Sequence, residues 1–148
     1  MNSVRRVLGN KGFEVWSVDP SASVYSALRV MAEQDIGAVM VVDGERLVGI
    51  FTERDYARKI VLQGKLSQDT PVRDVMTTSV IYVRPEQTVE ECMAVMSEHG
   101  VRHLPVVDGD RLVGLVSMRD VVRHIISEQE FMIEQLVSYI TDRRIVAR

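Results

Sequence analysis

Two short stretches of this 148-residue chain place a hydroxyl side chain three positions before an aspartate. They read GIFTERDYARKI and GLVSMRDVVRHI, and they contain Thr52 with Asp55 and Ser117 with Asp120. A hydroxyl at a helix start with a carboxylate in the first turn is a capping arrangement, and capping alone would explain each copy. A helix N-terminus also favours anions, and a carboxylate beside it can accept hydrogen bonds from a vicinal diol. The pattern is therefore equally consistent with a nucleotide site.

The two stretches belong to a tandem repeat. Residues 15–60 align without a gap with residues 80–125, and about 40% of the aligned positions are identical. In each copy a short β-rich stretch is followed by a helix, two apolar strands joined by an Asp-Gly turn, and a second helix. The β-rich stretches run from Val15 to Val18 and from Val80 to Val83, the first helices are capped by Ser23 and Thr88, and the turns are Asp43-Gly44 and Asp108-Gly109.

This order predicts a mixed α/β (α+β) fold built from two β-α-β-β-α units. A unit of about 50 residues is too small to bury its sheet well alone. We therefore expect the two units to pack sheet to sheet around one core, with pseudo-twofold symmetry.

The chain resembles a pair of cystathionine β-synthase (CBS) domains. The resemblance rests on the paired segments DGERLVGIFTERD and DGDRLVGLVSMRD and on DVMT, which opens the second repeat. It places CBS repeats at residues 13–65 and 74–127 and leaves 128–148 as a C-terminal helix extension. It implies a regulatory module without catalytic activity that binds an adenosine-containing ligand such as AMP, ADP, ATP, S-adenosylmethionine or NAD.

The resemblance also implies which residues bind the nucleotide. In CBS pairs the Thr/Ser-x-x-Asp stretch contacts ribose and phosphate, and the opposite repeat holds the adenine with its first strand and the start of its second. One expected cleft combines Thr52, Arg54 and Asp55 with Ile81, Tyr82, Arg102, His103 and Pro105. The other combines Ser117, Arg119 and Asp120 with Trp16, Val18, Gly37 and Ala38.

The two expected clefts differ in charge. Arg102 and His103 align with Gly37 and Ala38, and only the first pair offers charge-assisted donors to a phosphate. We therefore expect the Asp55 cleft to bind phosphate more tightly. Alternatively, Arg102 and His103 simply begin a solvated strand. The arginines inside the two motifs, Arg54 and Arg119, could likewise reach phosphate or pair with acidic neighbours.

Composition and missing motifs exclude several other classes of function. A net charge of -3 and a pI near 5.6 argue against a broad nucleic-acid or anionic-membrane surface. No apolar run approaches the roughly 20 residues that span a bilayer, and no signal sequence is evident, so we expect a cytoplasmic protein. The three histidines have no metal-ligand spacing, and the single cysteine, Cys92, fits a buried helix face. Phosphate-loop and nucleophile-elbow motifs are absent from the sequence.

Two segments lie outside the repeats. Near the N-terminus, Arg5, Arg6 and Lys11 lie near a cleft or are merely solvated. After the second motif, a long helix is predicted, with apolar residues on one face: Val122, Ile125, Ile126, Ile133, Leu136, Val137 and Ile140. This stripe either covers the module's own core or packs on a second copy, and we expect a homodimer. The output then passes through the dimer or an unidentified partner protein; the alternative is an interaction module with vestigial clefts.

Overall fold

The computed structural model describes residues 2–147, with side chains described as far as residue 141. Helix α1 (Val4–Lys11) precedes repeat 1, and a 3-10 turn over Val72–Asp74 precedes repeat 2. Repeat 1 contains β1 (Ser17–Val18), α2 (Val24–Gln34), β2 (Ala38–Asp43), β3 (Arg46–Thr52), and a helix that begins as α3 (Glu53–Asp55) and continues as a π-helix over Tyr56–Val61. Repeat 2 contains α4 (Val89–His99), β4 (His103–Asp108), β5 (Arg111–Ser117) and α5 (Met118–Ala147).

The predicted caps and turns are confirmed. The hydroxyl of Ser23 accepts a hydrogen bond from the Ser26 backbone N–H at 3.1 Å, and Thr88 forms a reciprocal capping box with Glu91. Both hairpins turn at a glycine in the left-handed region, Gly44 (φ 67°) and Gly109 (φ 69°), where a side chain would be strained. Local sequence therefore sets both helix starts and both hairpin registers.

The strands form one sheet in the order β1-β2-β3-β5-β4. The two hairpins meet near their tips, where β3 and β5 are antiparallel and pair at Arg46 and Arg111. Of the two predicted first strands, β1 is only two residues long, and its counterpart is reduced to a bridge between Val83 and Val106. The mixed α/β fold class and the C-terminal helix are confirmed.

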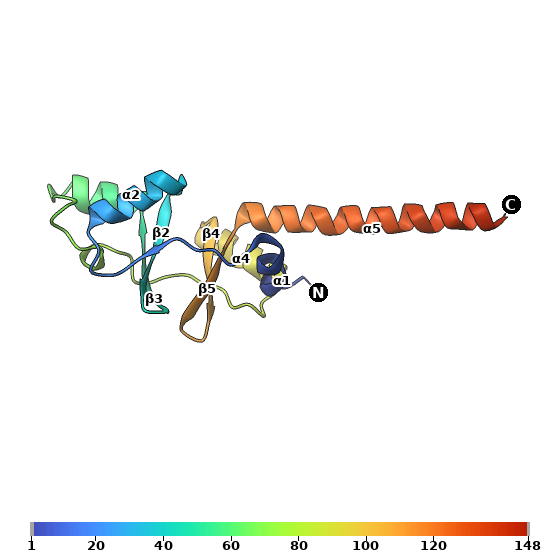
Figure 1. The fold of residues 1–148 in the computed structure, drawn as a ribbon, viewed down its shortest axis with the longest axis horizontal. Helices are drawn as coiled ribbons and strands as arrows, with labels where there is room; N and C mark the ends of the chain where they lie inside the picture. The colour runs from blue at the N-terminus through green and yellow to red at the C-terminus, as the bar shows by residue number, and fades with distance from the viewer. Residues whose placement is uncertain (1, 148) are drawn as a thin grey trace.

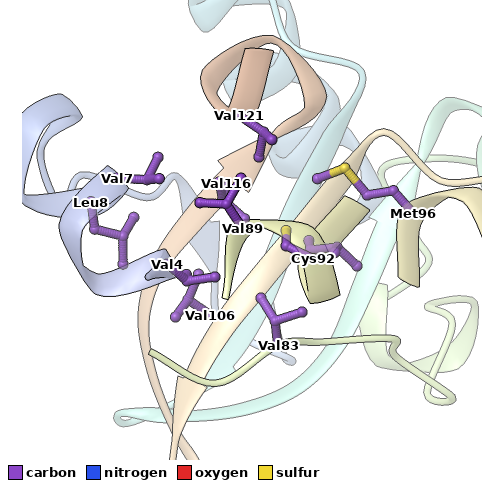
Figure 2. Packing of buried hydrophobic residues seen from close by; sticks show 11 residues of the cluster. Val4, Val7, Leu8, Val83, Val89, Cys92, Met96, Val106, Val116 and Val121 are labelled. Carbon is purple, nitrogen blue, oxygen red and sulfur yellow. The ribbon is translucent and has the colours of Figure 1, made fainter. Parts of the chain in front are cut away.

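The buried side chains form two clusters, so the expectation of one shared core is wrong. The reason is that the hairpins touch near their tips, and each hairpin therefore buries its face against its own helices. Figure 2 shows the cluster of repeat 2, in which α4, α5 and the β4–β5 hairpin meet α1. Cys92 lies in this cluster, as its helical position predicted. The cluster of repeat 1 includes Val72 from the linker and Val75 from the start of repeat 2.

Repeat 2 is covered by the segment that precedes repeat 1, and repeat 1 is covered by the opening segment of repeat 2. Leu8 of α1 packs on repeat 2, where a Cβ at Gly114 would lie 2.8 Å from its Cδ2. Met76, at the start of repeat 2, packs on repeat 1, where a Cβ at Gly49 would lie 2.5 Å from its Sδ. The glycines of the repeated Leu-Val-Gly sequence therefore make room for these crossing segments. This exchange ties the two repeats together.

Helix α5 begins inside repeat 2 and then leaves the body of the molecule. Figure 1 shows its C-terminal part projecting well beyond the sheet and the other helices. Its side chains from Gln129 to Thr141 are exposed. Within the described part of the chain, no helix is both long and apolar enough to span a membrane.

Candidate functional site

Both hydroxyl-aspartate motifs cap a helix. In repeat 1 the Asp55 backbone N–H donates to Thr52 Oγ1 at 3.1 Å, and the Thr52 backbone N–H donates to Asp55 Oδ2 at 3.0 Å. In repeat 2 the corresponding bonds join Asp120 to Ser117 at 3.0 Å and Ser117 to Asp120 at 2.9 Å. The capping interpretation of the motif is therefore confirmed in both copies, and it leaves open whether either copy also binds a ligand.

Asp55 is enclosed by partners from its own chain. The residue is only 5% exposed. Thr77 Oγ1 donates to Asp55 Oδ1 at 3.0 Å, and Lys59 Nζ lies 3.0 Å from the same oxygen. Together with the two bonds from Thr52, these contacts engage both carboxylate oxygens. A ribose diol would have to displace them to reach Asp55.

Asp120 is held by a residue from the other end of the chain. Lys11 Nζ lies 2.5 Å from Asp120 Oδ2 and donates to the Leu115 carbonyl at 2.9 Å. Burial by itself raises the pKa of the Asp120 carboxyl, but the hydrogen bonds from Lys11 and Ser117 outweigh it, so the pKa is lowered from its ordinary value. Asp120 is therefore an ionised acceptor at neutral pH. Of the N-terminal cations, Arg5 instead pairs with Glu86 and Arg6 with Glu128.

A groove of about 840 Å³ opens where β4 begins and α5 starts. Its basic wall is formed by Arg102, His103, Arg119 and Arg123, and its apolar wall by Met118, Val122 and Ile126, with Ser117 between them. The three arginines and His103 have no side-chain partner in the part of the chain that the structure describes. The groove thus combines free cations with an apolar surface, as anionic aromatic ligands require.

Arg102 and His103 lie beside the motif of their own repeat, whereas the family resemblance grouped them with the Asp55 motif. His103 is the register partner of Ser117, and the Met118 backbone N–H donates to the Arg102 carbonyl at 2.8 Å. The physical reason is the hairpin, because an antiparallel pair brings the start of its first strand beside the end of its second. The basic residues therefore belong to the motif of their own repeat, that of Asp120.

The matching place in repeat 1 has the opposite charge. Gly37 and Ala38 lie beside Thr52 through the same hairpin register, and the Glu53 backbone N–H donates to the Gly37 carbonyl at 3.1 Å. The hollow here is about 330 Å³, and its lining includes the acidic residues Asp35 and Glu53. A phosphate would be repelled here, so the two repeats offer different sites.

The remaining predicted residues also lie with their own repeats. Val18 in β1 pairs with Val41 of β2, and the Trp16 carbonyl accepts a hydrogen bond from Met40. Pro105 is buried in β4, where its carbonyl accepts a hydrogen bond from the N–H of Val83. Just before Val83, the side chain of Ile81 is half-buried and that of Tyr82 is exposed. The side chain of Arg54 is also exposed. None of these residues lines the groove of repeat 2.

Sequence reasoning missed several residues of these sites. Lys59 and Thr77 contact Asp55, and Arg123, Val122 and Ile126 line the groove. The spacing of Asp55 and Lys59, four apart on a predicted helix, could have indicated their ion pair. In the described residues, no group of three or more His, Cys, Asp or Glu side chains could hold a metal ion.

Comparisons with known proteins agree with the repeat structure. The sequence model of the CBS domain matches residues 10–62 and 72–127. A mitochondrial CBS domain-containing protein of Arabidopsis thaliana is 40% identical over 123 residues, which are 80% of this chain and 60% of that protein. A solved CBS-domain protein of Burkholderia ambifaria is 48% identical with a TM-score of 0.76, covering 86% of this chain and 96% of its own.

One relative carries a metal in its solved structure. Hypoxic response protein 1 of Mycobacterium tuberculosis is 34% identical over 112 residues, which are 75% of this chain and 78% of that protein. A structure under the name Hypoxic Response Protein I holds two coordinated zinc ions; it is 32% identical, with a TM-score of 0.74 over 84% of this chain and 99% of its own.

Proposed function

Because the chain belongs to the CBS-domain family, we propose that it is a non-catalytic regulatory module that binds an adenosine-containing nucleotide, such as AMP, ADP, ATP or NAD, in the groove of repeat 2. The observation that carries the proposal is the set of free cations in that groove. Arg102, Arg119 and Arg123 are without side-chain partners among the described residues. Arginines left unpaired on one wall of a concave site favour a ligand with several anionic oxygens.

The other wall supports a planar base. Met118, Val122 and Ile126 present apolar surface from the first turns of α5. An adenine ring placed there would bury apolar area while its phosphates face the arginines. The ribose would then lie near the capping motif, where Asp120 is an ionised acceptor that currently bonds to Lys11. The ligand therefore has to share Asp120 with Lys11.

Repeat 1 has a structural role in this proposal. Its aspartate, Asp55, is buried and saturated by Thr52, Thr77 and Lys59, and the adjacent hollow is acidic. The proposed ligand site therefore lies at Asp120, whereas the sequence predicted tighter phosphate binding at Asp55. Asp55 instead holds the start of the second repeat on the first.

The proposal includes no chemical step. The hydroxyl of Ser117 accepts a hydrogen bond from the Asp120 backbone N–H and has no hydrogen bond to His103. Among the described residues of the groove, no hydroxyl is therefore activated by a base. The output would pass to a second copy or to a partner protein. A cytoplasmic location stays a prediction, since the plant relative is mitochondrial by name.

A thermal-shift and calorimetric panel of AMP, ADP, ATP, NAD, S-adenosylmethionine and GTP tests the proposal. At about 100 times the dissociation constant, an adenine nucleotide should stabilise the protein by roughly 2.7 kcal/mol, which is several degrees in melting temperature. GTP should give a smaller shift. A flat panel would reject nucleotide binding and favour the alternative, an interaction module with vestigial clefts.

The repeat offers its own matched control for the site. Arg54 and Arg119 occupy the same position in the two motifs, and both are exposed and without a described partner. Arg119→Ala should weaken ATP binding by about tenfold or more, because it removes a charge-assisted hydrogen bond. Arg54→Ala should leave binding unchanged. Equal losses in both variants would argue against the repeat 2 groove.

A further inference from the structure

A hollow of about 330 Å³ lies between α1 and the first turns of α5. Figure 1 shows α1 beside the start of α5. The volume is at the lower end of the range for ligand sites, so the hollow suits a small group rather than a whole nucleotide. Its polar lining consists of Asn10, Lys11, Asp120, Arg123, His124 and Ser127. The hollow adjoins the groove of repeat 2, because Arg123 lines both spaces.

The lining of the hollow has a surplus of positive charge. Lys11 and Asp120 form an ion pair, so their charges balance. Glu128, the next acidic residue along α5, is paired with Arg6. Arg123 remains uncompensated, since it has no side-chain partner in the part of the chain that the structure describes. An anion in the hollow would therefore meet a positive wall.

Three further side chains offer hydrogen bonds to the hollow. Asn10 and Ser127 are exposed and have no side-chain partner among the described residues. His124 is only 6% exposed, and its Nε2 lies 3.3 Å from Asn2 Oδ1. Its Nδ1 has no partner in the described chain, although every fully buried side-chain nitrogen and oxygen there has one. The Nδ1 atom is therefore accessible, and the hollow is the space that His124 lines.

Comparison with repeat 1 explains why this histidine is free. Lys59 occupies the position of His124 in the repeat alignment, and it contacts the motif aspartate and a backbone carbonyl. In repeat 2, Lys11 makes the same two kinds of contact from α1. The residue at position 124 is thereby released from holding the aspartate. At the same offset, Ser127 stands where repeat 1 has the apolar Leu62. Repeat 2 therefore has two free polar groups at positions that repeat 1 uses otherwise.

We propose that this hollow binds a phosphate group, which accepts hydrogen bonds from Arg123, His124 and Ser127 on α5 and from Asn10 on α1. A phosphate group has at least three acceptor oxygens, so it can use donors on both helices, whereas a carboxylate has only two oxygens. His124 donates from Nδ1 either as that tautomer or as the protonated ring. The group is inorganic phosphate or the terminal phosphate of a nucleotide in the groove, and only the second source rests on the proposed function.

The three histidines of the chain make a site-specific test possible, because each reports on a different place. His124 lines the hollow, His103 lines the groove, and His99, at the end of α4, lines neither. Inorganic phosphate is titrated into the full chain at constant pH and ionic strength while the imidazole NMR signals are recorded. The His124 signal should shift to saturation with a dissociation constant on the order of 1 mM, and the His99 signal should stay in place.

Two serine variants locate the phosphate. Ser127→Glu places a carboxylate in the hollow and should weaken phosphate binding at His124 by about tenfold or more. Ser138→Glu is the matched control, since it makes the same change on the same helix about 16 Å further along, beyond the screening length of about 8 Å. It should leave phosphate binding unchanged. Both serines are exposed, so both variants should keep the melting temperature of the wild type.

A His124 signal that does not shift with phosphate up to about 20 mM would overturn the proposal. So would a shift confined to His103, because phosphate would then bind only in the groove, and so would equal binding by the two serine variants.

Repeating the titration with AMP-saturated and ATP-saturated protein identifies the source of the phosphate. If ATP alone shifts the His124 signal and excludes added phosphate, its terminal phosphate occupies the hollow. If phosphate still binds beside ATP, the ligand is inorganic phosphate. Phosphate binding at His124 in a chain that binds no nucleotide would support this site and reject the proposed function.

Discussion

Lys11 Nζ lies 2.5 Å from Asp120 Oδ2, which joins the last residue of α1 to the aspartate of the second motif. These residues are far apart in sequence and meet because α1 docks on repeat 2 through Val4, Val7 and Leu8. In repeat 1 the corresponding aspartate, Asp55, is contacted by Thr77 from the start of repeat 2. In both repeats, a segment from outside the repeat therefore reaches the motif carboxylate.

We predict that Lys11→Met tightens the binding of adenosine by about threefold to tenfold. Lys11 donates a hydrogen bond to an oxygen of Asp120, and the ribose diol would otherwise donate to that oxygen without competition. Adenosine is the proper probe because it carries no phosphate, so the loss of the Lys11 charge does not itself weaken binding. Calorimetric titration gives the affinity.

Lys59→Met is the control for this prediction, because Lys59 holds Asp55 in the same way on the side that we consider structural. It should lower stability without changing adenosine affinity. If Lys11→Met instead bound these ligands more weakly, and if the loss of affinity increased from adenosine to AMP to ATP, the prediction would be contradicted and Lys11 would be identified as a phosphate ligand.

The lowered pKa of Asp120 predicts a pH-dependent contribution to stability. A carboxyl whose folded pKa lies below its unfolded value stabilises the fold above the unfolded pKa, near 4, and loses this contribution as the pH falls through the folded pKa. Asp120→Asn keeps much of the cap and should cost about 1–3 kcal/mol at pH 7. Urea unfolding at pH 7 and pH 3 should show this difference shrinking in acid, and a constant difference would contradict the assignment.

The buried thiol should be chemically inert in the folded protein. Burial raises the pKa of Cys92 to about 11, so only about one molecule in a thousand carries the thiolate at pH 8. Iodoacetamide should therefore modify the native chain far more slowly than a free thiol and should react fully in denaturant. Mass spectrometry over time gives both rates, and rapid native labelling would show that repeat 2 opens easily.

Local features of the fold were predictable because their causes are local. The Asp-Gly turns, the Ser23 and Thr88 caps and the long C-terminal helix each depend on residues close in sequence. The tandem repeat predicted the overall architecture, because a gapless self-alignment implies two similar structural units. The capping role of both motifs followed from the hydroxyl and carboxylate alone.

The site was harder to predict because its contacts are long-range. Lys11 reaches Asp120 because α1 crosses to repeat 2, and Thr77 reaches Asp55 because the start of repeat 2 crosses to repeat 1. The family resemblance grouped Arg102 with the Asp55 motif, whereas the hairpin register places Arg102 beside the motif of its own repeat. The sequence showed that the two clefts carry different charges. Only the structure shows that the basic lining lies beside Ser117 and the acidic lining beside Gly37.

The crossing segments predict a coupled pair of substitutions at Leu8 and Gly114. A Cβ at Gly114 would meet both Leu8 methyl groups at 2.8 and 2.9 Å, and Leu8 is fully buried, so Gly114→Ala should cost about 1–3 kcal/mol by overpacking. Leu8→Ala should cost about 2–5 kcal/mol by leaving a cavity. In the double variant the new methyl occupies space that Leu8 vacates, so its total cost should fall below the sum by 0.5 kcal/mol or more, roughly. Urea unfolding of the four proteins measures this coupling. Strictly additive costs would mean that α1 does not pack on Gly114 in solution, and the Lys11 contact with Asp120 would lose its support.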